Sequence, residues 1–383
     1  MTVLKKVFAF LKKEPMLPLS VTAALLSFLI TPPSAALLSE IDWRTLATLF
    51  LMLTVLEGFK KEQIFTPLLR LASRIRTAAG LGLFLVFSVF FSSMFVTNDV
   101  SLIIFVPLTI LLFRAAKKEG YILPLLAMEN IAAVRGSLLT PFGSPQNLFI
   151  FGQSGVTAAR FIGYMAPIWA ISGVLLVGFV LFLFRKNVRE KTLLPPDAFP
   201  AKLPAAGRGK RILYLVLFAA LLFMIVSRAT FWLPLSGAIA LAILVFDRRV
   251  FLRCDYVLLV TFLCFFVFSS GVAANLAVAA FLSATVAGRE YFGSILVSQV
   301  ISNVPASIVL YPFAENRGAL LYGLDSAGLV TLIGSLASII NYRLYVREYP
   351  GRGGAFVKTF TLISLLFFAL VVVPGFFISL SPL

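Results

Sequence analysis

The chain has 383 residues, of which 60% are hydrophobic and 13% are charged, with 33 Lys and Arg against 16 Asp and Glu. Its mean hydropathy is +1.01. This composition excludes a soluble globular domain and indicates an all-α polytopic membrane protein. The chain has no His, and its two cysteines, Cys254 and Cys264, match no zinc or redox spacing. We therefore expect no metal-based catalytic site and no cofactor.

Apolar segments succeed one another along the whole chain, and we expect them to be membrane helices. They fall at about residues 15–31, 45–58, 77–114, 121–151, 161–184, 211–228, 231–246, 256–274, 283–313, 319–346 and 356–379. Residues 62–76 predict a helix that lies on the inner leaflet. Residues 185–211 are basic and rich in proline, which predicts a cytoplasmic linker.

The segment 77–114 is interrupted by the polar stretch 97–99 and has basic residues at both ends. Positively charged flanks belong on the cytoplasmic side of a membrane. A segment with both flanks on one side must enter and return, so we predict a re-entrant hairpin with its tip at Asn98. Segment 283–313 repeats the pattern around Asn303, but its flanks are poor in Lys and Arg. It is therefore predicted to be a second hairpin that enters from outside.

The distribution of positive charge predicts how the spans are oriented. With the N-terminus in the cytoplasm, 27 of the 33 Lys and Arg residues fall in cytoplasmic segments and five fall outside. Arg135 then lies within the membrane. This asymmetry follows the positive-inside rule. It predicts about nine spans and two opposed re-entrant hairpins, with the C-terminus outside.

The two hairpins share a sequence pattern at a constant offset of 205 residues. The matched pairs are Ser93 and Ser298, Thr97 and Ser302, Asn98 and Asn303, and Pro107 and Pro312. Residues four apart share a helix face, so each copy presents two hydroxyls and an amide. Elsewhere, Asp42 matches Asp255 at an offset of 213, and Gly143 matches Gly334 at an offset of 191. Matched spans run in opposite directions, which predicts an inverted repeat.

This repeat divides the chain into three parts. The first repeat covers residues 1–184, with hairpin 77–114 and broken helix 121–151; residues 185–229 hold the basic linker and an extra span; residues 230–383 form the second, inverted repeat, with hairpin 283–313 and broken helix 319–346.

Each hairpin is followed by a span with a soft centre, by which we mean a middle section that contains glycine and hydroxyl residues. These sections are residues 136–147 in the first repeat and 331–338 in the second. Pro141 and Gly143 should interrupt the first of these helices and free backbone carbonyls. Carbonyl, hydroxyl and amide oxygens suit Na⁺. A proline kink that only shapes packing is the alternative. Two soft centres at matching positions beside polar tips favour a binding site.

Asp99 at the first tip is matched by Val304 at the second, so the predicted site is asymmetric in charge. A carboxylate at this depth must bind a cation, carry a proton or pair with an Arg. Arg135, about 21 Å into its span, could hold Asp99 or Asp325, or attract an anionic substrate, and these roles stay open. Asp325 and Glu129 are further proton-coupling candidates beside Asp99.

Four stretches carry a resemblance to a known family. They are FVTNDVSLIIFVPL (95–108), LLTPFGSPQNLFIF (138–151), VSQVISNVPASIVL (297–310) and LVTLIGSLASII (329–340). In this order and spacing they resemble the ion transporter superfamily, and within it the ArsB/NhaD-type permeases with their YbiR-like anion permease group. The resemblance covers most of both repeats. It implies a secondary transporter with a scaffold part and a mobile transport part that move past one another like an elevator.

The resemblance also implies a set of binding residues. In related sodium-coupled carboxylate carriers, the hairpin Ser and Asn groups and the broken-helix Gly bind Na⁺, and the loops between them hold substrate. Carried over, the Na⁺ ligands are Ser93, Thr97, Asn98, Gly143, Ser298, Ser302, Asn303 and Gly334. Ser144 and Ser335 face substrate, and the full substrate-binding set is Thr97, Asn98, Asp99, Arg135, Thr140, Ser144, Asn147, Ser302, Asn303, Thr331 and Ser335.

The tips depart from the carboxylate carriers, which have Ser-Asn-Thr at both tips. This chain has Thr97-Asn98-Asp99 and Ser302-Asn303-Val304 instead. The loss of both threonines and the gain of an acid weaken the dicarboxylate interpretation. An Asn-Asp tip is similar to the arsenite-efflux and sodium/proton-antiport branches.

We therefore expect an ion-coupled secondary transporter of a small inorganic or organic anion or weak acid in the inner membrane, with Na⁺ or H⁺ as coupling ion and Asp99 as coupling acid. The alternatives are a Na⁺/H⁺ antiporter that binds no anion, an arsenite-type efflux permease and a passive channel. No catalytic motif supports an enzyme. The expected partners are the lipid bilayer and the small ion or anion, without nucleic acid, and a homodimer stays open.

Overall fold

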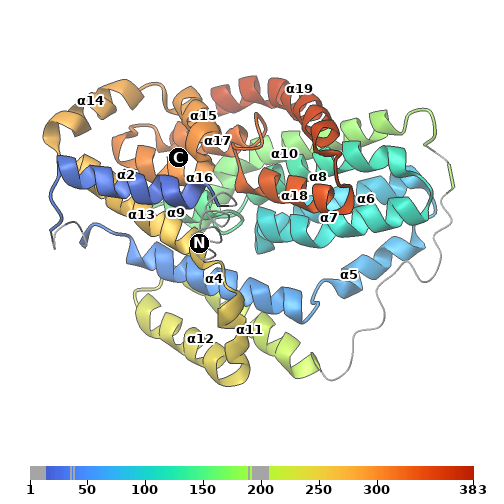
Figure 1. Cartoon of the computed structure of the whole chain (residues 1–383), viewed down its shortest axis with the longest axis horizontal. Helices are drawn as coiled ribbons and strands as arrows, with labels where there is room; N and C mark the ends of the chain where they lie inside the picture. The colour runs from blue at the N-terminus through green and yellow to red at the C-terminus, as the bar shows by residue number, and fades with distance from the viewer. Residues whose placement is uncertain (1–13, 35–36, 38, 189, 192–206) are drawn as a thin grey trace, which may run out of the picture.

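The protein is built almost entirely from helices, as Figure 1 shows. The computed structural model describes residues 14–34, 37, 39–188, 190–191 and 207–383, so most of the predicted linker lies outside the described residues. Within the described residues, strand pairing is limited to one isolated antiparallel bridge between Thr77 and Lys191. The predicted all-α fold class is therefore confirmed.

The helices follow the chain in the order that the hydropathy predicts. The first predicted repeat contains α2 (Met16–Ile30), α4 (Trp43–Lys61), α5 (Thr66–Leu71), α6 (Ala78–Val96), α7 (Asn98–Ala115), α8 (Ile122–Ser137), α9 (Pro145–Ser154) and α10 (Ala158–Leu183). The extra span is α11 (Arg208–Val226). The second predicted repeat contains α12 (Trp232–Asp247), α13 (Tyr256–Ala273), α14 (Leu276–Val286), α15 (Glu290–Ile301), α16 (Asn303–Leu310), α17 (Arg317–Ala327), α18 (Leu336–Glu348) and α19 (Gly353–Ser379).

Six of the described helices are long and apolar enough to cross a membrane: α6, α7, α10, α11, α13 and α19. Helix α2 is apolar but has only 15 residues. In α10 and α19, 22% of the most apolar window is buried inside the protein, against 61% in α7. The outer helices therefore present most of their apolar side chains outward, as lipid-facing helices do, while the arms of the first hairpin belong to the core.

Two matched acids, Asp42 and Asp255, directly precede helices α4 and α13. The Asp42 carboxylate accepts a hydrogen bond from the Thr45 N–H at 2.9 Å, and Asp255 accepts one from the Leu258 N–H at 3.0 Å. Their backbone angles agree, with φ −76° and ψ 78° at Asp42 and φ −78° and ψ 82° at Asp255. Each acid satisfies an N–H that the helix leaves unbonded. Helices α4 and α13 therefore start in the same way, although the division into repeats stays a prediction.

The second hairpin starts later than the sequence predicts. The predicted segment begins at residue 283, but residues 276–286 form the separate helix α14, and the hairpin begins with α15 at Glu290. Gly288, with φ 73°, turns the chain between these two helices. Because the residues on both sides of the turn are apolar, hydropathy does not show the boundary. In chain order, α14 comes directly after α13, just as α5 comes directly after α4.

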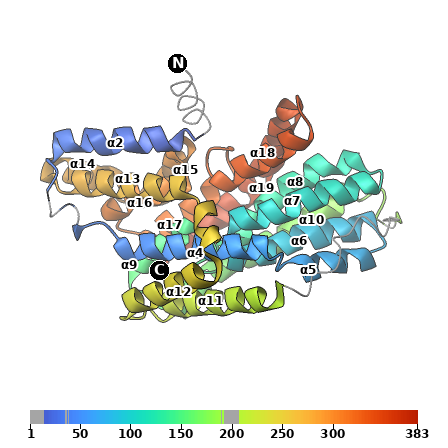
Figure 2. The ribbon, with the colours of Figure 1, turned by 60° about the horizontal axis from the view of Figure 1, so that its bottom comes forward.

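Several helices outside the hairpins pack on α4 or α13. Helix α2 lies along α13, whereas α11 and α12 lie along α4 (Figure 2). The Tyr214 ring of α11 fills the space above Gly58 of α4, and its hydroxyl donates to Asp247 of α12 at 3.0 Å. Lys61 of α4 donates to the same carboxylate at 2.6 Å. These contacts join three helices into one body.

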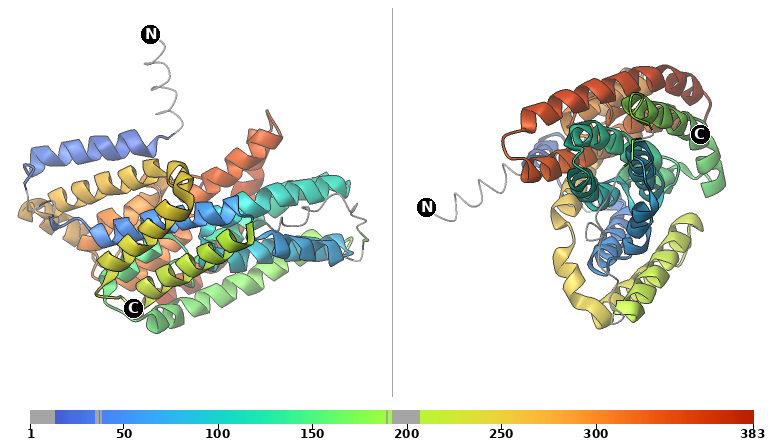
Figure 3. Two further views of the ribbon diagram at one scale, coloured as in Figure 1. Left: turned by 90° about the horizontal axis from the view of Figure 1, so that it is seen from below. Right: turned by 90° about the vertical axis from the view of Figure 1, so that its right-hand side faces the viewer.

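The hairpins and broken helices form a second body. Helix α6 packs on α8, α15 packs on α17, and α18 lies against α7 and α8. Seen along the long axis of the molecule, α6, α7 and α8 lie between α19 and the α11–α12 pair (Figure 3). The predicted polar residues are therefore carried by the inner helices.

Candidate functional site

The two hairpin tips have the same backbone geometry. Thr97 has φ 70° and ψ 156°, and Ser302 has φ 67° and ψ 159°. Residues other than Gly rarely adopt this region, and doing so costs on the order of 1–3 kcal/mol. The following residue, Asn98 or Asn303, begins the returning helix α7 or α16. Matched strain at both tips indicates that the surroundings hold each tip in one shape, as binding sites require.

Each tip is bonded to the broken helix that follows it in the chain. The breaks cover residues 138–144, between α8 and α9, and 328–335, between α17 and α18. In the first, the Thr140 hydroxyl donates to the Met94 carbonyl of the first hairpin. In the second, the Gly334 carbonyl accepts from the Asn303 N–H at 3.2 Å. Tip and break therefore form one unit in each predicted repeat.

Both breaks depend on a glycine at the matched position. A Cβ atom on Gly143 would lie 2.1 Å from the Ser137 carbonyl oxygen, and one on Gly334 would lie 2.2 Å from the Ala327 carbonyl oxygen. No side chain fits at such distances unless the backbone shifts. The chain can fold back against the end of the preceding helix only because these residues are glycines. The predicted soft centres are therefore true helix breaks of similar construction.

Several predicted ligand oxygens in the tips and breaks have no hydrogen-bond partner among the described residues. They are Ser144 Oγ, Asn147 Oδ1, Ser302 Oγ and Asn303 Oδ1. All four side chains are buried. A buried polar atom without a partner is costly, and hydroxyl and amide oxygens are hard ligands of the kind that Na⁺ takes. These atoms could therefore hold a cation.

The helix hydroxyls that precede the tips are already used as donors. Ser93 donates to the Phe90 carbonyl at 3.0 Å, and Ser298 donates to the Ser294 carbonyl at 2.6 Å. Asn98 Oδ1 accepts from the Asp99 N–H at 3.0 Å. The serine oxygens retain lone pairs that can face a cation.

Two small cavities, which we name the tip cavities, adjoin the hairpin tips. The first measures about 110 Å³ and is bordered by Thr97, Asp99 and Ser144 together with residues of α4 and α13. The second measures about 130 Å³ and is bordered by Asp99 and Ser302 together with residues of α2, α13 and α18. Asp99 and Asp255 border both. The two tips therefore meet around Asp99.

The positive charges at the tip cavities are already paired. Lys60 contacts Glu57, and Arg343 lies 3.1 Å from Glu14. Asp99 has no ion pair among the described residues, and its Oδ1 atom is buried without a hydrogen-bond partner. A carboxylate with a buried oxygen atom that has no partner favours a cation or a proton.

Arg135 is not placed beside Asp99. Its Nε donates to Ser172 Oγ at 2.9 Å, and its Nη1 donates to the Asp325 backbone carbonyl at 3.4 Å. The Asp325 carboxylate accepts from Gln146 Nε2 at 3.0 Å. Neither Arg135 nor Asp325 borders a tip cavity. The two residues instead connect α8 and α9 of the first predicted repeat to α17 of the second.

The remaining predicted substrate residues border neither tip cavity. They are Asn98, Thr140, Asn147, Asn303, Thr331 and Ser335. Thr331 is exposed and donates to Gln299 Oε1 at 2.7 Å. Glu129 is fully buried and accepts a hydrogen bond from Thr109. The structure therefore brings together at the cavities only part of the predicted set.

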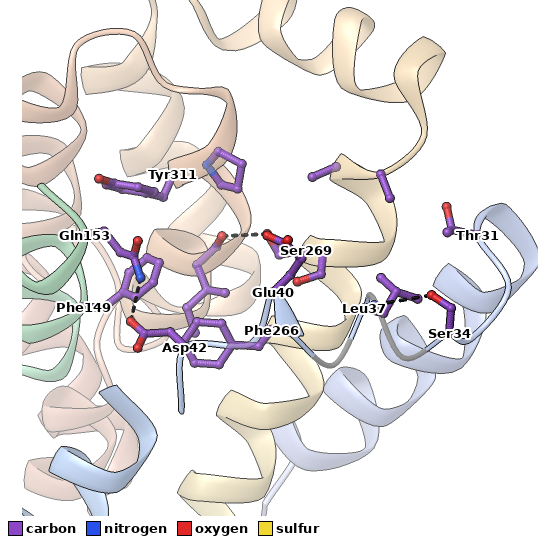
Figure 4. Close-up of a pocket in the computed structure, with 15 residues that line it drawn as sticks. Thr31, Ser34, Leu37, Glu40, Asp42, Phe149, Gln153, Phe266, Ser269 and Tyr311 are labelled. Carbon is purple, nitrogen blue, oxygen red and sulfur yellow. Dashed lines mark hydrogen bonds between the residues drawn. The ribbon is translucent and has the colours of Figure 1, made fainter. Parts of the chain in front are cut away.

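A larger cavity, which we name the vestibule, lies at the other ends of α4 and α13 (Figure 4). Its volume is about 560 Å³. Asp42, at the start of α4, borders it and accepts a hydrogen bond from Gln153 at 2.7 Å. Ala273, at the end of α13, also borders it, whereas Asp255 precedes the start of that helix. Helix α13 is about 27 Å long, so vestibule and tip cavities lie toward opposite faces of the molecule.

About one helical turn separates the vestibule from the tip cavities. In α13, Phe262 borders the second tip cavity and Phe266 borders the vestibule. In α9, Leu148 borders the first tip cavity and Phe149 borders the vestibule. The Phe149 ring packs edge to face on Phe266 at 5.5 Å and on Tyr311 at 5.3 Å. All three rings border the vestibule, and we name this group the aromatic barrier.

Sequence reasoning missed both Asp255 and this barrier. The match of Asp255 with Asp42 marked the position as part of the repeat, but its nearness to Asp99 depends on tertiary packing. The chain has 39 phenylalanines, and no sequence signal distinguishes Phe149 and Phe266 from the others.

Comparison with a protein family supports the transporter interpretation. The profile of the CitMHS family, described as a citrate transporter, matches residues 7–328. This range contains both hairpins and all of the first broken helix.

Two curated relatives agree with the family. The inner membrane protein YbiR of Escherichia coli K12 is 32% identical over 327 residues, which cover 83% of this chain and 84% of YbiR. An uncharacterized transporter of Methanocaldococcus jannaschii is 30% identical over 309 residues, which cover 79% of this chain and 81% of that protein. The predicted resemblance to the YbiR-like group is thereby confirmed.

A solved structure shares the fold. The crystal structure of the Alcanivorax borkumensis YdaH transporter, described as having an unusual topology, aligns with a TM-score of 0.54 and 16% sequence identity, over 98% of this chain and 97% of that one. Fold, family and relatives together identify a multi-pass membrane protein and a secondary transporter rather than an enzyme. The chain belongs to the CitMHS citrate transporter family.

Proposed function

We propose that this protein is an ion-coupled secondary transporter that carries a small organic or inorganic anion, or a weak acid, across the inner membrane, with its N-terminus in the cytoplasm. The hairpin tips and helix breaks bind the coupling ion and the substrate, and Asp99 is the coupling acid. Citrate is the first anion to test, because the family description names it.

One observation carries this proposal. The tip residues Thr97, Asp99 and Ser302 border cavities at one end of α13, and the vestibule lies at the other end beyond a thin aromatic barrier. A carrier must expose one site to each side in turn, and binding sites of such carriers lie between two repeats at broken helices. This arrangement supports a carrier whose site is open toward the end of the molecule that holds Lys60 and Arg343. The charge distribution predicts that this end is cytoplasmic.

The charge at the tips supports ion coupling. Asp99 has no cationic partner among the described side chains, so an anion that approached it alone would be repelled. A proton or Na⁺ at Asp99 removes this repulsion and leaves the polar tip groups free to bind the anion. Binding of the anion therefore requires binding of the cation, which is the thermodynamic basis of coupled transport.

The division into two bodies supports an elevator-type movement. We assign α2, α4, α11, α12 and α13 to a scaffold part and the hairpins with the broken helices to a transport part. Sliding of the transport part along α4 and α13 would move the tips from one end of these helices toward the vestibule at the other.

A thermal-shift assay on purified protein tests the proposal. Melting is measured across Na⁺, Li⁺ and pH, with and without citrate, other carboxylates and inorganic oxyanions. A ligand that binds only the folded state raises the melting temperature by mass action. We expect stabilisation by an anion that is stronger with Na⁺ or acid. No anion-dependent stabilisation under any of these conditions would contradict the anion carrier.

A Na⁺/H⁺ antiporter is the second candidate, because the unpaired Asp99 carboxylate suits alternate binding of Na⁺ and H⁺. The same assay distinguishes it from the anion carrier. Stabilisation by Na⁺ that is opposed by acid and indifferent to every anion would favour the antiporter.

A further inference from the structure

A buried polar cluster lies where α7, α8 and α18 meet. Its members are Thr109, Glu129, Asn130, Ser338 and Asn341, each of which is 0% exposed. Helix α18 presents Leu336, Ile339, Ile340 and Arg343 to the tip cavities. Ser338 and Asn341 are three residues apart and lie on its opposite face. The width of α18 therefore separates this cluster, which we name the Glu129 cluster, from the tip cavities.

Hydrogen bonds connect α7 and α18 to one face of α8. The Thr109 hydroxyl of α7 donates to the Glu129 carboxylate. Asn130 Nδ2 donates to Ser338 Oγ of α18 at 3.0 Å. Asn341 Nδ2 donates to the Leu126 carbonyl at 2.7 Å. Leu126 lies three residues before Glu129 and four before Asn130, so the Asn341 side chain lies against the surface between them.

Three oxygen atoms of the cluster have no hydrogen-bond partner among the described residues. They are Glu129 Oε2, Asn130 Oδ1 and Asn341 Oδ1. Each asparagine amide nitrogen donates one of its two hydrogens to another group, and neither amide makes a described hydrogen bond to Glu129 Oε2. The described ion pairs include no Lys or Arg at Glu129. A fully buried carboxylate and two buried amide oxygens without donors are costly unless a ligand binds them.

A cation accounts for these atoms better than a proton does. A proton on Glu129 Oε2 gives the cluster one donor, which leaves one of the two amide oxygens unsatisfied. A monovalent cation would balance the single negative charge and would take oxygen atoms of this kind as ligands. The Thr109 and Ser338 hydroxyls belong to the same cluster, and carboxylate, amide and hydroxyl oxygens are hard ligands.

We propose that the Glu129 cluster is a Na⁺ site, with Glu129, Asn130 and Asn341 as its ligands. The site is distinct from the tips and goes beyond the proposed function, because it borders neither tip cavity. Ion binding here joins α7 and α8 of the first repeat to α18 of the second. The Na⁺ therefore holds the two halves of the transport part together.

Melting of purified full-length protein tests the site. Wild type is titrated with NaCl at constant ionic strength, with KCl and choline chloride as the replacing salts. We expect a Na⁺-specific rise in melting temperature. Glu129→Gln and Asn341→Ala should each weaken the apparent Na⁺ affinity by about tenfold or more, because each removes an oxygen ligand. Ser364→Ala, which removes a fully buried hydroxyl of α19 without a partner, should leave the Na⁺ response unchanged.

The same titration on Asp99→Asn separates this site from the tips. In the Asp99→Asn protein, we expect the Glu129-dependent part of the Na⁺ response to persist even when transport is lost. If Glu129→Gln does not fold, Asn341→Ala decides the question, because the Asn341 side chain makes one hydrogen bond to the described residues, to the Leu126 carbonyl. A Na⁺ response in Asn341→Ala equal to that of wild type, or a wild-type response equal in K⁺ and choline, would overturn the proposal.

Discussion

At the scale of single residues, the site is defined by backbone constraints as much as by polar groups. Thr97 and Ser302 have nearly the same unfavourable angles, and Gly143 and Gly334 approach carbonyl oxygens at nearly the same distance. Matched constraints of this kind indicate that the two tips and the two breaks are built in the same way. They are expected if both tips must hold oxygen atoms in one arrangement.

The glycines of the breaks give the first prediction. Gly143→Ala and Gly334→Ala should each destabilise the protein by about 1–3 kcal/mol, because the new methyl group collides with backbone. Gly163→Ala is the control, since its Cβ meets nothing within 4 Å in the exposed part of α10, and it should be neutral or stabilising by up to about 1 kcal/mol. Melting temperatures measure all three. Equal stability of the two break variants and wild type would contradict the described geometry.

The sequence predicted the residue types of the tips but not all of their contacts. The constant offsets between repeats identified Thr97, Asn98, Asp99 and their partners, because repeated polar groups in an apolar chain stand out. Whether Arg135 meets Asp99 or Asp325 depends on how two repeats pack, and spacing along one chain does not contain that information. The structure places Arg135 with Asp325.

At the scale of elements, the thin barrier is the feature with the clearest consequence. Phe149 and Phe266 border the vestibule, and Leu148 and Phe262, at most one helical turn away, border the tip cavities. Removal of a ring from such a short barrier is therefore expected to weaken the exclusion of water and ions.

The barrier gives the second prediction. Phe266→Ala should raise the passive leak of ions through reconstituted protein, because it connects the vestibule to the second tip cavity. Phe356→Ala removes an equally buried ring from α19, away from both cavities, and should lower stability without adding a leak. Each truncation is expected to cost about 3–5 kcal/mol of folding stability. Decay of an imposed Na⁺ gradient in proteoliposomes measures the leak, and the same decay rate for both variants would exclude the barrier role.

Most elements could be predicted from sequence, and the exceptions have a common cause. Flanking charges and interrupted apolar runs predicted both hairpins and both broken helices. The boundary between α14 and α15 was missed because both helices are apolar and only a glycine turn divides them. Hydropathy detects changes in polarity, whereas this boundary is a change of direction.

At the scale of the whole molecule, the positions of two exposed ion pairs allow the proposed sliding of the transport part to be tested. Glu14, just before α2, pairs with Arg343 of α18 at 3.1 Å, so this pair connects the proposed scaffold to the proposed transport part. Arg114 of α7 pairs with Glu348 of α18 at 3.5 Å, within the transport part. Exposed pairs add little stability, so their positions can be replaced with small effect on folding.

Cross-linking at these positions gives the third prediction. In a chain without Cys254 and Cys264, the pair Glu14→Cys and Arg343→Cys is joined by a reducible bifunctional maleimide. Transport should be nearly abolished and should return on reduction, because the link prevents the transport part from sliding. The pair Arg114→Cys and Glu348→Cys, joined in the same way, should transport normally. Full transport by the first cross-linked pair would exclude the elevator movement.

The central claim is that Asp99 couples an ion gradient to movement of an anion, and gradient-driven uptake tests it most directly. Wild type and Asp99→Asn are reconstituted in proteoliposomes, and uptake of the most stabilising anion, with citrate tested first, is measured under imposed Na⁺ and pH gradients. We predict that wild type accumulates the anion against its gradient and that Asp99→Asn, though folded, does not. Full, pH-independent accumulation by Asp99→Asn would contradict the account, because the carboxylate would then be only structural.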